Sequence, residues 1–285
     1  SNFIIVGLPD TAVQESKERI ASAIRSNSLI PPSAKHKRII IILAPADIRK
    51  EGPAYDLPIA VGYLLETEQV KFDTSDKLFL GELSLNGAIK PVNGALSAAI
   101  LAHKQDFKEI ILPIANAGEA SVVEGMRVFG VTTITELIDH LSGIKPLKPI
   151  PYQHPKASVS EEDGEAFRLI KGQESAKRAL AVAAAGGHNI LMSGPPGSGK
   201  TLLAKALVDL MPNLSFPEAI EVTRIYSSLG LVNGASLLSS RPFRSPHHTT
   251  SAPAMVGGGT NPKPGEISLS HRGVLFLDEL PEFPR

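Results

Sequence analysis

The stretch GPPGSGKT, Gly194–Thr201, brings three glycines, a lysine and a threonine together. Its spacing is G-x-x-x-x-G-K-[ST], a pattern in which backbone N–H groups turn inward around phosphate oxygens without a Cβ in the way. Lys200 would then reach the β- and γ-phosphates of a nucleotide, and Thr201 would bind Mg²⁺. The predicted ligands are ATP and Mg²⁺, and the predicted binding residues are Gly194, Pro195, Pro196, Gly197, Ser198, Gly199, Lys200 and Thr201.

A second stretch, GVLFLDE, ends an apolar run on two carboxylates, Asp278 and Glu279. We expect Asp278 to hold Mg²⁺ together with Thr201, directly or through water, and Glu279 to polarise the attacking water. Lys200 and Glu279 are therefore the predicted catalytic residues, and an Asp-Glu pair suggests hydrolysis rather than nucleotide sensing alone. The alternative is a strand end followed by a solvated acidic turn.

The elements around the glycine stretch fit a phosphate site. A helix over 173–185, a strand over 189–192 and a helix over 200–210 are predicted in that order. Because the last helix begins at Lys200, the positive end of its dipole would face the phosphates. The sequence therefore predicts a P-loop between a strand and a helix.

The first half of the chain alternates short apolar runs with amphipathic stretches, which indicates a mixed α/β class. Asp10 is the predicted N-cap of the first helix. A strand near Leu78–Leu85 is predicted to break at Gly81. The other predicted strands are 3–6, 39–43, 109–112 and 128–131, and the other predicted helices are 57–65, 95–103, 116–124 and 135–141.

The composition changes at GIKPLKPIPYQHPKASVSEEDGE, which has four prolines and a run of acids. Such a stretch is extended and packs poorly, so we interpret it as a linker. The predicted division is a first domain over 1–142, a linker over 143–165 and an ATPase domain over 166–285.

The whole-chain composition excludes several classes of protein. Lys plus Arg equals Asp plus Glu at 29 each, so no global charge favours nucleic acid, although a local basic patch stays possible. No cysteine is present, which excludes disulfides and thiol metal sites. No apolar run reaches the ~18 residues that a membrane span needs. We expect a cytoplasmic protein with no membrane partner.

The second half resembles AAA+ ATPases of the magnesium-chelatase-like group, also called the ComM or YifB family. The resemblance rests on IKGQESAKRALAVAAAGGHNILMSGPPGSGKT, RPFRSPHHTTSAPAMVGGG and PGEISLSHRGVLFLDELPEF. It implies self-association into a hexameric ring and a DNA helicase that drives branch migration in natural transformation. A chelatase-type remodelling ATPase with a protein or tetrapyrrole partner is the alternative.

In this clade an insertion between the two nucleotide motifs forms a hairpin facing the pore of the ring. Here it would fall within 227–273, with Gly257–Gly259 giving it mobility. Charged residues there could contact a phosphate backbone, or simply be solvated: Arg241, Arg244, Lys263 and Arg272. His247 and His248 are expected to point to opposite faces, so a shared metal is not expected, and a hydrogen-bonding or nucleotide-sensing role is favoured.

The stretches KEGPAYDLPIA and GELSLNGAIKPVNGALSAAILA resemble the proteolytic domain of Lon-type proteases, which has the ribosomal S5 domain 2-type α/β fold. That family uses a Ser–Lys dyad, but this sequence has Ala54 after Gly-Pro and Leu96 where the lysine should lie. We therefore expect no peptidase activity. Lys50 and Ser97 are a substitute pair that we do not favour, because nucleophile and base must lie within hydrogen-bond reach.

Two further expectations concern the ends of the chain and its basic residues. The sequence stops at Arg285, before the sensor residues, arginine finger and helical lid that the resemblance implies, so the AAA+ domain is expected to be partial. We expect this chain alone to bind ATP weakly and hydrolyse it poorly. A basic cluster over 35–38 either meets nucleic acid or is solvated.

Overall fold

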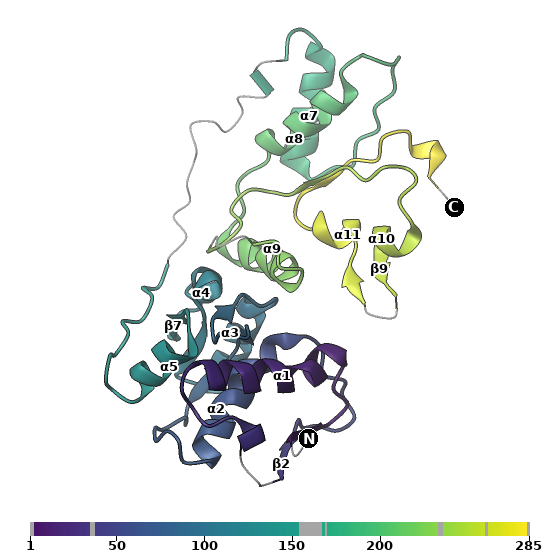
Figure 1. Ribbon diagram of the computed structural model, residues 1–285. Coiled ribbons are helices and arrows are strands. Elements are labelled where there is room, and N and C mark those ends of the chain that lie inside the picture. The colour runs from purple at the N-terminus through teal and green to yellow at the C-terminus, as the bar shows by residue number, and fades with distance from the viewer. Residues whose placement is uncertain are drawn as a thin grey trace. The chain divides into compact units, whose positions relative to one another are not determined.

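The computed structural model describes residues 3–34, 38–153, 167–168, 170–232, 236–259 and 262–283. The chain divides into two compact units (Figure 1). Unit 1 covers Ser1–His154 with Gly230–Ser236, and unit 2 covers Pro155–Leu229 with Leu237–Arg285. The division near residue 154 falls within the range predicted as a linker, whose own bounds stay a prediction.

Unit 1 alternates helices with short strands, as a mixed α/β sequence predicts. Short 3₁₀ turns lie at Pro32–Ala34 and Pro53–Tyr55. In chain order its elements are β1 (Phe3–Val6), α1 (Thr11–Ser26), β2 (Ile39–Ile42), α2 (Asp56–Glu66), β3 (Lys77–Phe79), β4 (Glu82–Leu83), β5 (Ile89–Lys90), α3 (Ala95–Lys104), β6 (Glu109–Pro113), α4 (Ile114–Ala120), β7 (Arg127–Val131) and α5 (Ile134–Leu141).

The strands that the structure describes in unit 1 form three small sheets. β1 pairs in parallel with β2, and β3, β6 and β7 form a parallel sheet in that order. β4 and β5 form an antiparallel pair. The register places Ile111 between Phe79 and Phe129, which puts three apolar side chains of the main core side by side. Burial of such side chains is the main stabilising term for the unit.

The N-terminus of α1 is built as the sequence predicts. Asp10 Oδ1 accepts a hydrogen bond from the Val13 N–H at 2.7 Å, and Asp10 Oδ2 accepts one from the Gly52 N–H at 3.0 Å. One carboxylate therefore caps α1 and fixes the loop that leads into the Pro53–Tyr55 turn.

A buried ion pair joins α1 to α2. Asp56 is fully buried and accepts hydrogen bonds from Arg19 Nε at 2.6 Å, from the Leu83 N–H at 3.1 Å and from the Ser16 hydroxyl. The hydrogen bond to Asp56 raises the pKa of Arg19. Because several donors hydrogen-bond to the Asp56 carboxylate, these bonds offset the free-energy cost of removing its charge from water.

Unit 2 is built around a pair of packed helices, α7 and α8 (Figure 1). Ile170, Leu180, Leu203 and Leu207 form the centre of its apolar cluster. A 3₁₀ turn lies at Leu280–Glu282. In chain order its elements are α7 (Glu174–Gly186), α8 (Lys200–Leu210), α9 (Phe216–Ser228), β8 (Phe243–Arg244), α10 (Ala252–Val256), β9 (Gly257–Gly258), β10 (Lys263–Pro264), α11 (Glu266–Leu269) and β11 (Val274–Leu275).

Two sequence predictions of elements are wrong. The predicted strand over 189–192 is extended, but no strand of the described residues pairs with it. Ile190 and Met192 pack against the helix cluster, whereas Leu191 is 83% exposed. The helix predicted over 116–124 lies earlier, at Ile114–Ala120, because a turn ends it at Ser121.

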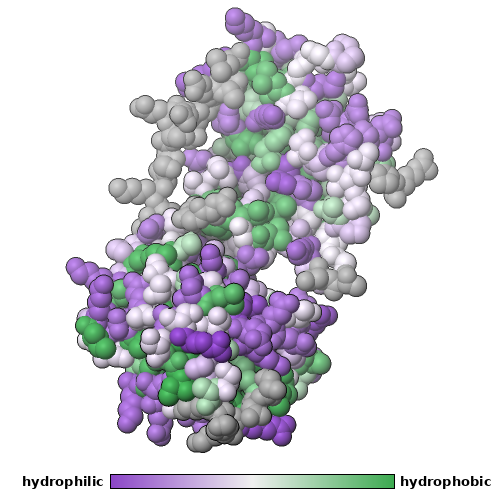
Figure 2. Space-filling model, viewed as in Figure 1, coloured by the Kyte–Doolittle hydropathy of each residue, from purple (hydrophilic) through white to green (hydrophobic). Residues whose placement is uncertain are grey.

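The surface of each unit mixes polar and apolar side chains, as the alternating purple and green in Figure 2 shows. Ile42 and Leu191 are among the most exposed large apolar residues. Within the described part of the chain, no helix is both long and apolar enough to cross a bilayer. The cytoplasmic location stays a prediction.

We predict that Asp56→Ala destabilises the protein by about 2 kcal/mol or more, because it removes the hydrogen bonds from the partly buried Arg19 guanidinium and leaves the Leu83 N–H without its acceptor. The measurement is the free energy of urea unfolding, followed by circular dichroism. The matched control is Glu15→Ala, which removes an exposed carboxylate 3.8 Å from Arg19 and should change stability by less than about 1 kcal/mol. Equal losses in the two variants would contradict the prediction.

Candidate functional site

The glycine stretch forms a loop that runs directly into α8, whose first residue is Lys200. Gly197 and Gly199 have φ of 77° and 87°, a region that residues with a Cβ rarely adopt. A Cβ built on either glycine meets no atom within 4 Å, so the backbone conformation, rather than crowding, requires glycine. The Leu203 N–H donates to the Gly199 carbonyl at 2.9 Å, which starts the helix directly behind the loop.

Lys200 lies over this loop. Its Nζ donates hydrogen bonds to the carbonyls of Gly194 at 2.9 Å and Pro195 at 3.1 Å. The ammonium group is therefore held at the mouth of the loop, at the N-terminus of α8. The positive charge of the ammonium group and the positive end of the helix dipole both favour the binding of an anion at this place.

Thr201 and Asp278 meet although 77 positions separate them in the sequence. The Thr201 hydroxyl donates to Asp278 Oδ2 at 3.4 Å, and Asp278 Oδ1 accepts from the Glu279 N–H at 3.1 Å. A hydroxyl and a carboxylate oxygen are ligands that Mg²⁺ takes in proteins. The donor set of this pair fits such a cation.

The strand β11 carries Asp278 to this position. β11 pairs in parallel with β8, and the Phe276 N–H continues the ladder by donating to the Arg244 carbonyl at 2.8 Å. Val274 packs against the cluster that contains Leu203 and Leu207 of α8. The acidic end of the strand is thus tied to the helix that begins at Lys200. The strand itself is shorter than the apolar run predicts and ends at Leu275.

Glu279 follows in a left-handed backbone conformation with φ 53°. Its Oε2 lies 3.3 Å from Nδ1 of His248, and its side chain is 66% exposed. The rings of His247 and His248 are 4.1 Å apart and tilted by 35°. The prediction that they point to opposite faces is wrong, because they lie in a turn rather than a strand. No group of three or more metal-ligating side chains occurs among the described residues.

A hairpin lies within the range predicted for the insertion. β9 pairs with β10 in an antiparallel register, Gly257 opposite Pro264 and Gly258 opposite Lys263. Figure 1 shows it projecting from α10 and α11. A Cβ at Gly265 would lie 2.5 Å from the Gly257 N atom, so the two backbones touch at the base of the hairpin. Glycine at these two positions therefore permits close packing of the backbones, and the mobility expected of Gly257–Gly259 stays a prediction.

The three arginines that could contact a phosphate backbone, or simply be solvated, are instead engaged by other groups of unit 2. Arg244 makes a two-bonded pair with Glu266 at 2.6 and 2.7 Å, and this contact raises the pKa of Arg244. Arg272 pairs with Glu221 at 2.9 Å. Arg241 donates to the carbonyls of Pro212 at 2.5 Å and Arg272 at 2.6 Å.

Sequence reasoning missed the acidic partners of these arginines. Glu218 and Glu221 lie three positions apart on α9, so they share one face of the helix, and that spacing is the signal that could have found them. Hydrogen bonds from Arg272 and then His271 lower the pKa of Glu221. The fourth predicted residue, Lys263, is exposed on β10. Of the basic cluster over 35–38, residues 35–37 lie outside the described residues, and Arg38 is exposed.

In unit 1 the positions of the expected dyad hold apolar side chains. Ala54 lies in the Pro53–Tyr55 turn, and Leu96 is fully buried in α3. Lys50 is buried, and its Nζ donates to the carbonyls of Pro45 and Ile48, the latter at 2.7 Å. The ammonium group that could replace the missing base is thus occupied by backbone acceptors.

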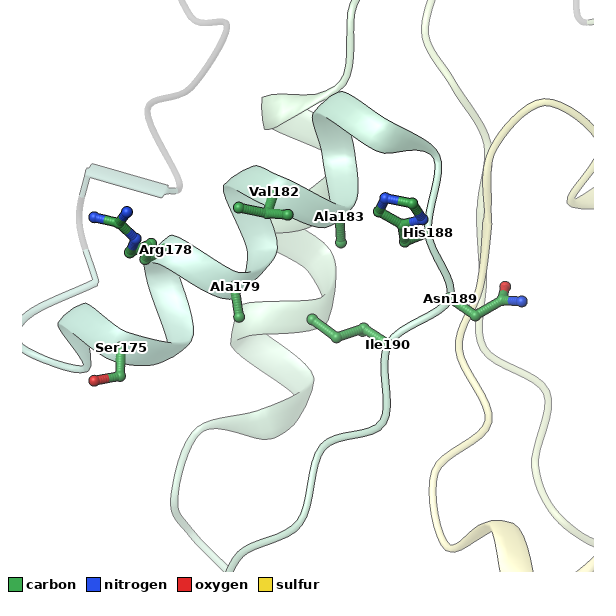
Figure 3. Close-up of a pocket in the computed structure, with 8 residues that line it drawn as sticks. All are labelled: Ser175, Arg178, Ala179, Val182, Ala183, His188, Asn189 and Ile190. Carbon is green, nitrogen blue, oxygen red and sulfur yellow. The ribbon is translucent and has the colours of Figure 1, made fainter.

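A pocket of about 410 Å³ lies beside α7 and the extended segment that follows it, away from the glycine loop. Figure 3 shows Ile190 pointing toward the helices and Asn189 pointing away from them. The lining contains no residue of Gly194–Thr201, so this pocket is not the predicted phosphate site. Its lining residues are Ser175, Arg178, Ala179, Val182, Ala183, His188, Asn189 and Ile190.

Comparison with known proteins identifies the family. Residues 166–285 match the family described as magnesium chelatase, subunit ChlI, and residues 1–116 match the family described as subunit ChlI of Mg-chelatase. Competence protein ComM of Haemophilus influenzae is 43% identical over 287 residues, which is 99% of this chain and 55% of that protein. The chain belongs to the magnesium-chelatase-like ComM/YifB family.

Two other relatives cover different shares of this family member. Protein YifB of Escherichia coli is 45% identical over 285 residues, covering 99% of this chain and 54% of YifB. Lon protease 2 of Bacillus subtilis is 25% identical over 138 residues, which is 48% of this chain and 24% of that protease. The chain spans about half the length of its ComM and YifB relatives.

We predict that Arg244→Lys lowers the free energy of unfolding by about 1 kcal/mol, since an ammonium cannot replace the two parallel bonds that a guanidinium makes to Glu266. The measurement is urea unfolding of the whole chain. Lys263→Ala is the control, because its side chain is exposed on the hairpin and its loss should leave the unfolding midpoint unchanged. A wild-type midpoint for Arg244→Lys would show that the pair contributes nothing to the fold.

Proposed function

We propose that this chain is the nucleotide-binding part of an ATP-hydrolysing AAA+ motor that assembles into a ring and acts on DNA. The observation that carries the proposal is the approach of Asp278 to Thr201, at 3.4 Å, beside the loop that holds Lys200. It unites two sequence motifs that are far apart in the chain. Membership of a magnesium-chelatase-like family supports the use of a nucleotide and Mg²⁺.

The residues of the loop fit the phosphates of ATP. The backbone of Gly194–Thr201 would surround them, and Lys200 would exchange its two carbonyl partners for phosphate oxygens. Thr201 and Asp278 would hold Mg²⁺, which, when bound, neutralises phosphate charge. The Lys200 ammonium, the Thr201 hydroxyl and the Asp278 carboxylate that would take these roles lie beside the loop.

Glu279 is proposed to polarise the attacking water. It follows Asp278 directly, and its carboxylate is 66% exposed, so it can reach solvent. The proposed catalytic residues are thus Lys200 and Glu279. The adjacent Asp278 is proposed to bind Mg²⁺. Two neighbouring carboxylates would thus divide the work, one binding the cation and the other polarising the water.

The action on DNA rests on the relatives and on the hairpin. The Haemophilus relative is named a competence protein, and it is similar over nearly all of this chain. The hairpin presents Lys263 to solvent, whereas Arg241, Arg244 and Arg272 are engaged within unit 2. We therefore propose that Lys263, rather than the arginines, contacts the DNA phosphates from this hairpin. The proposed activity of the motor on DNA is branch migration in natural transformation.

A chelatase-type remodelling ATPase is the second candidate. The observation that favours it is the engagement of three arginines, Arg241, Arg244 and Arg272, by acids and carbonyls of unit 2 rather than by solvent alone. In that case the hairpin would contact a protein or tetrapyrrole partner. Peptidase activity is not proposed, since Ala54 and Leu96 supply neither a nucleophile nor a base.

We predict that Glu279→Gln lowers ATP turnover of the full-length protein by at least about 100-fold while ATP affinity changes little, because only water activation is lost. Lys200→Ala should instead abolish ATP binding. Turnover is followed by phosphate release, and affinity by a fluorescent ATP analogue. Glu282→Gln, an exposed acid in the next turn, is the matched control. Wild-type turnover in Glu279→Gln would refute the role of Glu279.

We also predict that forked DNA at low salt stimulates ATP turnover, and that Lys263→Ala reduces the salt slope of DNA binding by about one phosphate contact. Lys205→Ala, an exposed lysine on α8, should keep the wild-type slope. DNA binding is measured by fluorescence anisotropy across salt concentrations. A healthy basal turnover without any stimulation would favour the protein or tetrapyrrole partner.

A further inference from the structure

The chain that follows α5 folds back onto unit 1, and we call its residues 144–153 the strap. Leu147 packs against the main apolar cluster of the unit, and Ile150 packs against a second cluster of side chains from α3, α4, β6 and β7. The two lysines of the strap, Lys145 and Lys148, are exposed. The strap therefore covers apolar surface of unit 1, although its range was predicted as part of a linker.

Backbone hydrogen bonds attach the strap to unit 1 at separate points. The Ile150 N–H donates to the Val128 carbonyl at 2.8 Å, which places an antiparallel bridge on β7, the edge strand of the β3-β6-β7 sheet. The Gln153 N–H donates to the Ser121 carbonyl at 3.2 Å. The three prolines of the strap have no N–H and cannot extend such a ladder. A segment attached at separate points opens at a lower free-energy cost than the core of its unit.

A side chain of α5, His140, provides a further attachment. The Leu147 N–H donates to Nδ1 of His140 at 3.0 Å. The ring of His140 packs on that of Phe129 in β7, with ring centres 4.6 Å apart. A ring nitrogen that accepts a hydrogen bond carries no proton, so this contact requires the neutral imidazole with its proton on Nε2. Protonation of Nδ1 would turn the acceptor into a donor that faces another donor, and the contact would be lost.

The charges around His140 also favour its neutral form. Burial lowers the pKa of His140; Glu109 opposes this effect and Lys77 adds to it. Glu109, buried at the start of β6, already pairs with Arg127 of β7 at 2.6 Å and with Lys77 of β3 at 3.6 Å. On α5 itself, Glu136 lies one turn earlier and accepts hydrogen bonds from the residue before the helix cap. Both carboxylates are thus engaged by other groups.

We propose that the strap is a pH-sensitive latch, which neutral His140 holds on the edge of β7 and which protonation of His140 releases. In the released state the imidazole regains its ordinary pKa, about 6.5. Because the released state binds the proton more readily, the contribution of His140 to docking is fully present above that pH and is lost as the pH falls toward the lowered value. Release uncovers the edge of β7 and frees the strap from unit 1.

The test is amide hydrogen exchange of the whole chain at about pH 7.5 and at about pH 5.5, on either side of the ordinary pKa of histidine. Exchange is read by mass spectrometry on peptides from residues 144–153 and is corrected for the intrinsic effect of pH. We expect the protection of the strap amides to fall about three- to tenfold at the lower pH. Peptides from α3 should keep their protection.

Two variants of His140 separate the hydrogen bond from the packing of the ring. His140→Asn places a non-titrating acceptor near the position of Nδ1, so its strap should stay protected at both pH values. His140→Phe keeps the contact with Phe129 but has no acceptor, so its strap should exchange at about pH 7.5 as the wild type does at about pH 5.5. The matched control is His103→Asn, which changes an exposed histidine on α3 and should keep the wild-type response.

Three outcomes would overturn the latch. One is a loss of strap protection in His140→Asn equal to that of the wild type at the lower pH. Another is wild-type protection in His140→Phe. The third is a loss of protection in α3 together with the strap, which would mean unfolding of unit 1 in place of release. No readout involves ATP turnover, so each outcome is independent of the proposed function.

Discussion

The parallel pairing of β8 with β11 determines where the chemical groups of unit 2 lie. The pairing is short, but Val274 anchors it to the cluster of α7 and α8, and the rings of Phe243 and Phe276 stack 6.1 Å apart beside it. Two loops must then leave at one edge. One carries Asp278 to the hydroxyl of Thr201, and the other carries His248 to Glu279. If the pair separated, both contacts would be lost together.

Three arginines of unit 2 form contacts that hold its own loops in place. A neutral sequence with equal numbers of acids and bases allows each of the three arginines to find a carboxylate or carbonyl nearby. These contacts fix the start of α11, the turn before β11 and the segment after α8. Partly exposed pairs of this kind stabilise a fold only modestly, so their main effect is to define loop positions.

The sequence was most informative where a residue's role is local. The P-loop, the Asp10 cap and the bounds of α8 follow from glycine, carboxylate and helix signals within a few residues. Sequence reasoning failed where the outcome depends on a distant partner. No strand of the described residues pairs with the predicted strand over 189–192, and the pairing of Arg244 with Glu266 was not predicted. The approach of Asp278 to Thr201 was expected from the chemistry of a P-loop, which needs an acidic strand end to share Mg²⁺ with the threonine, and not from the spacing of the two motifs in the chain.

The burial of Leu96 limits which side chains its position can accept. The resemblance to Lon-type proteases places a catalytic lysine at this position, yet here the side chain is enclosed by α3 and its neighbours with none of its surface exposed. A single change back to lysine would enclose an ammonium group without a partner, at a cost that a domain of ordinary stability cannot bear. A return of the lysine would therefore need further substitutions around position 96 that supply a partner for its ammonium group.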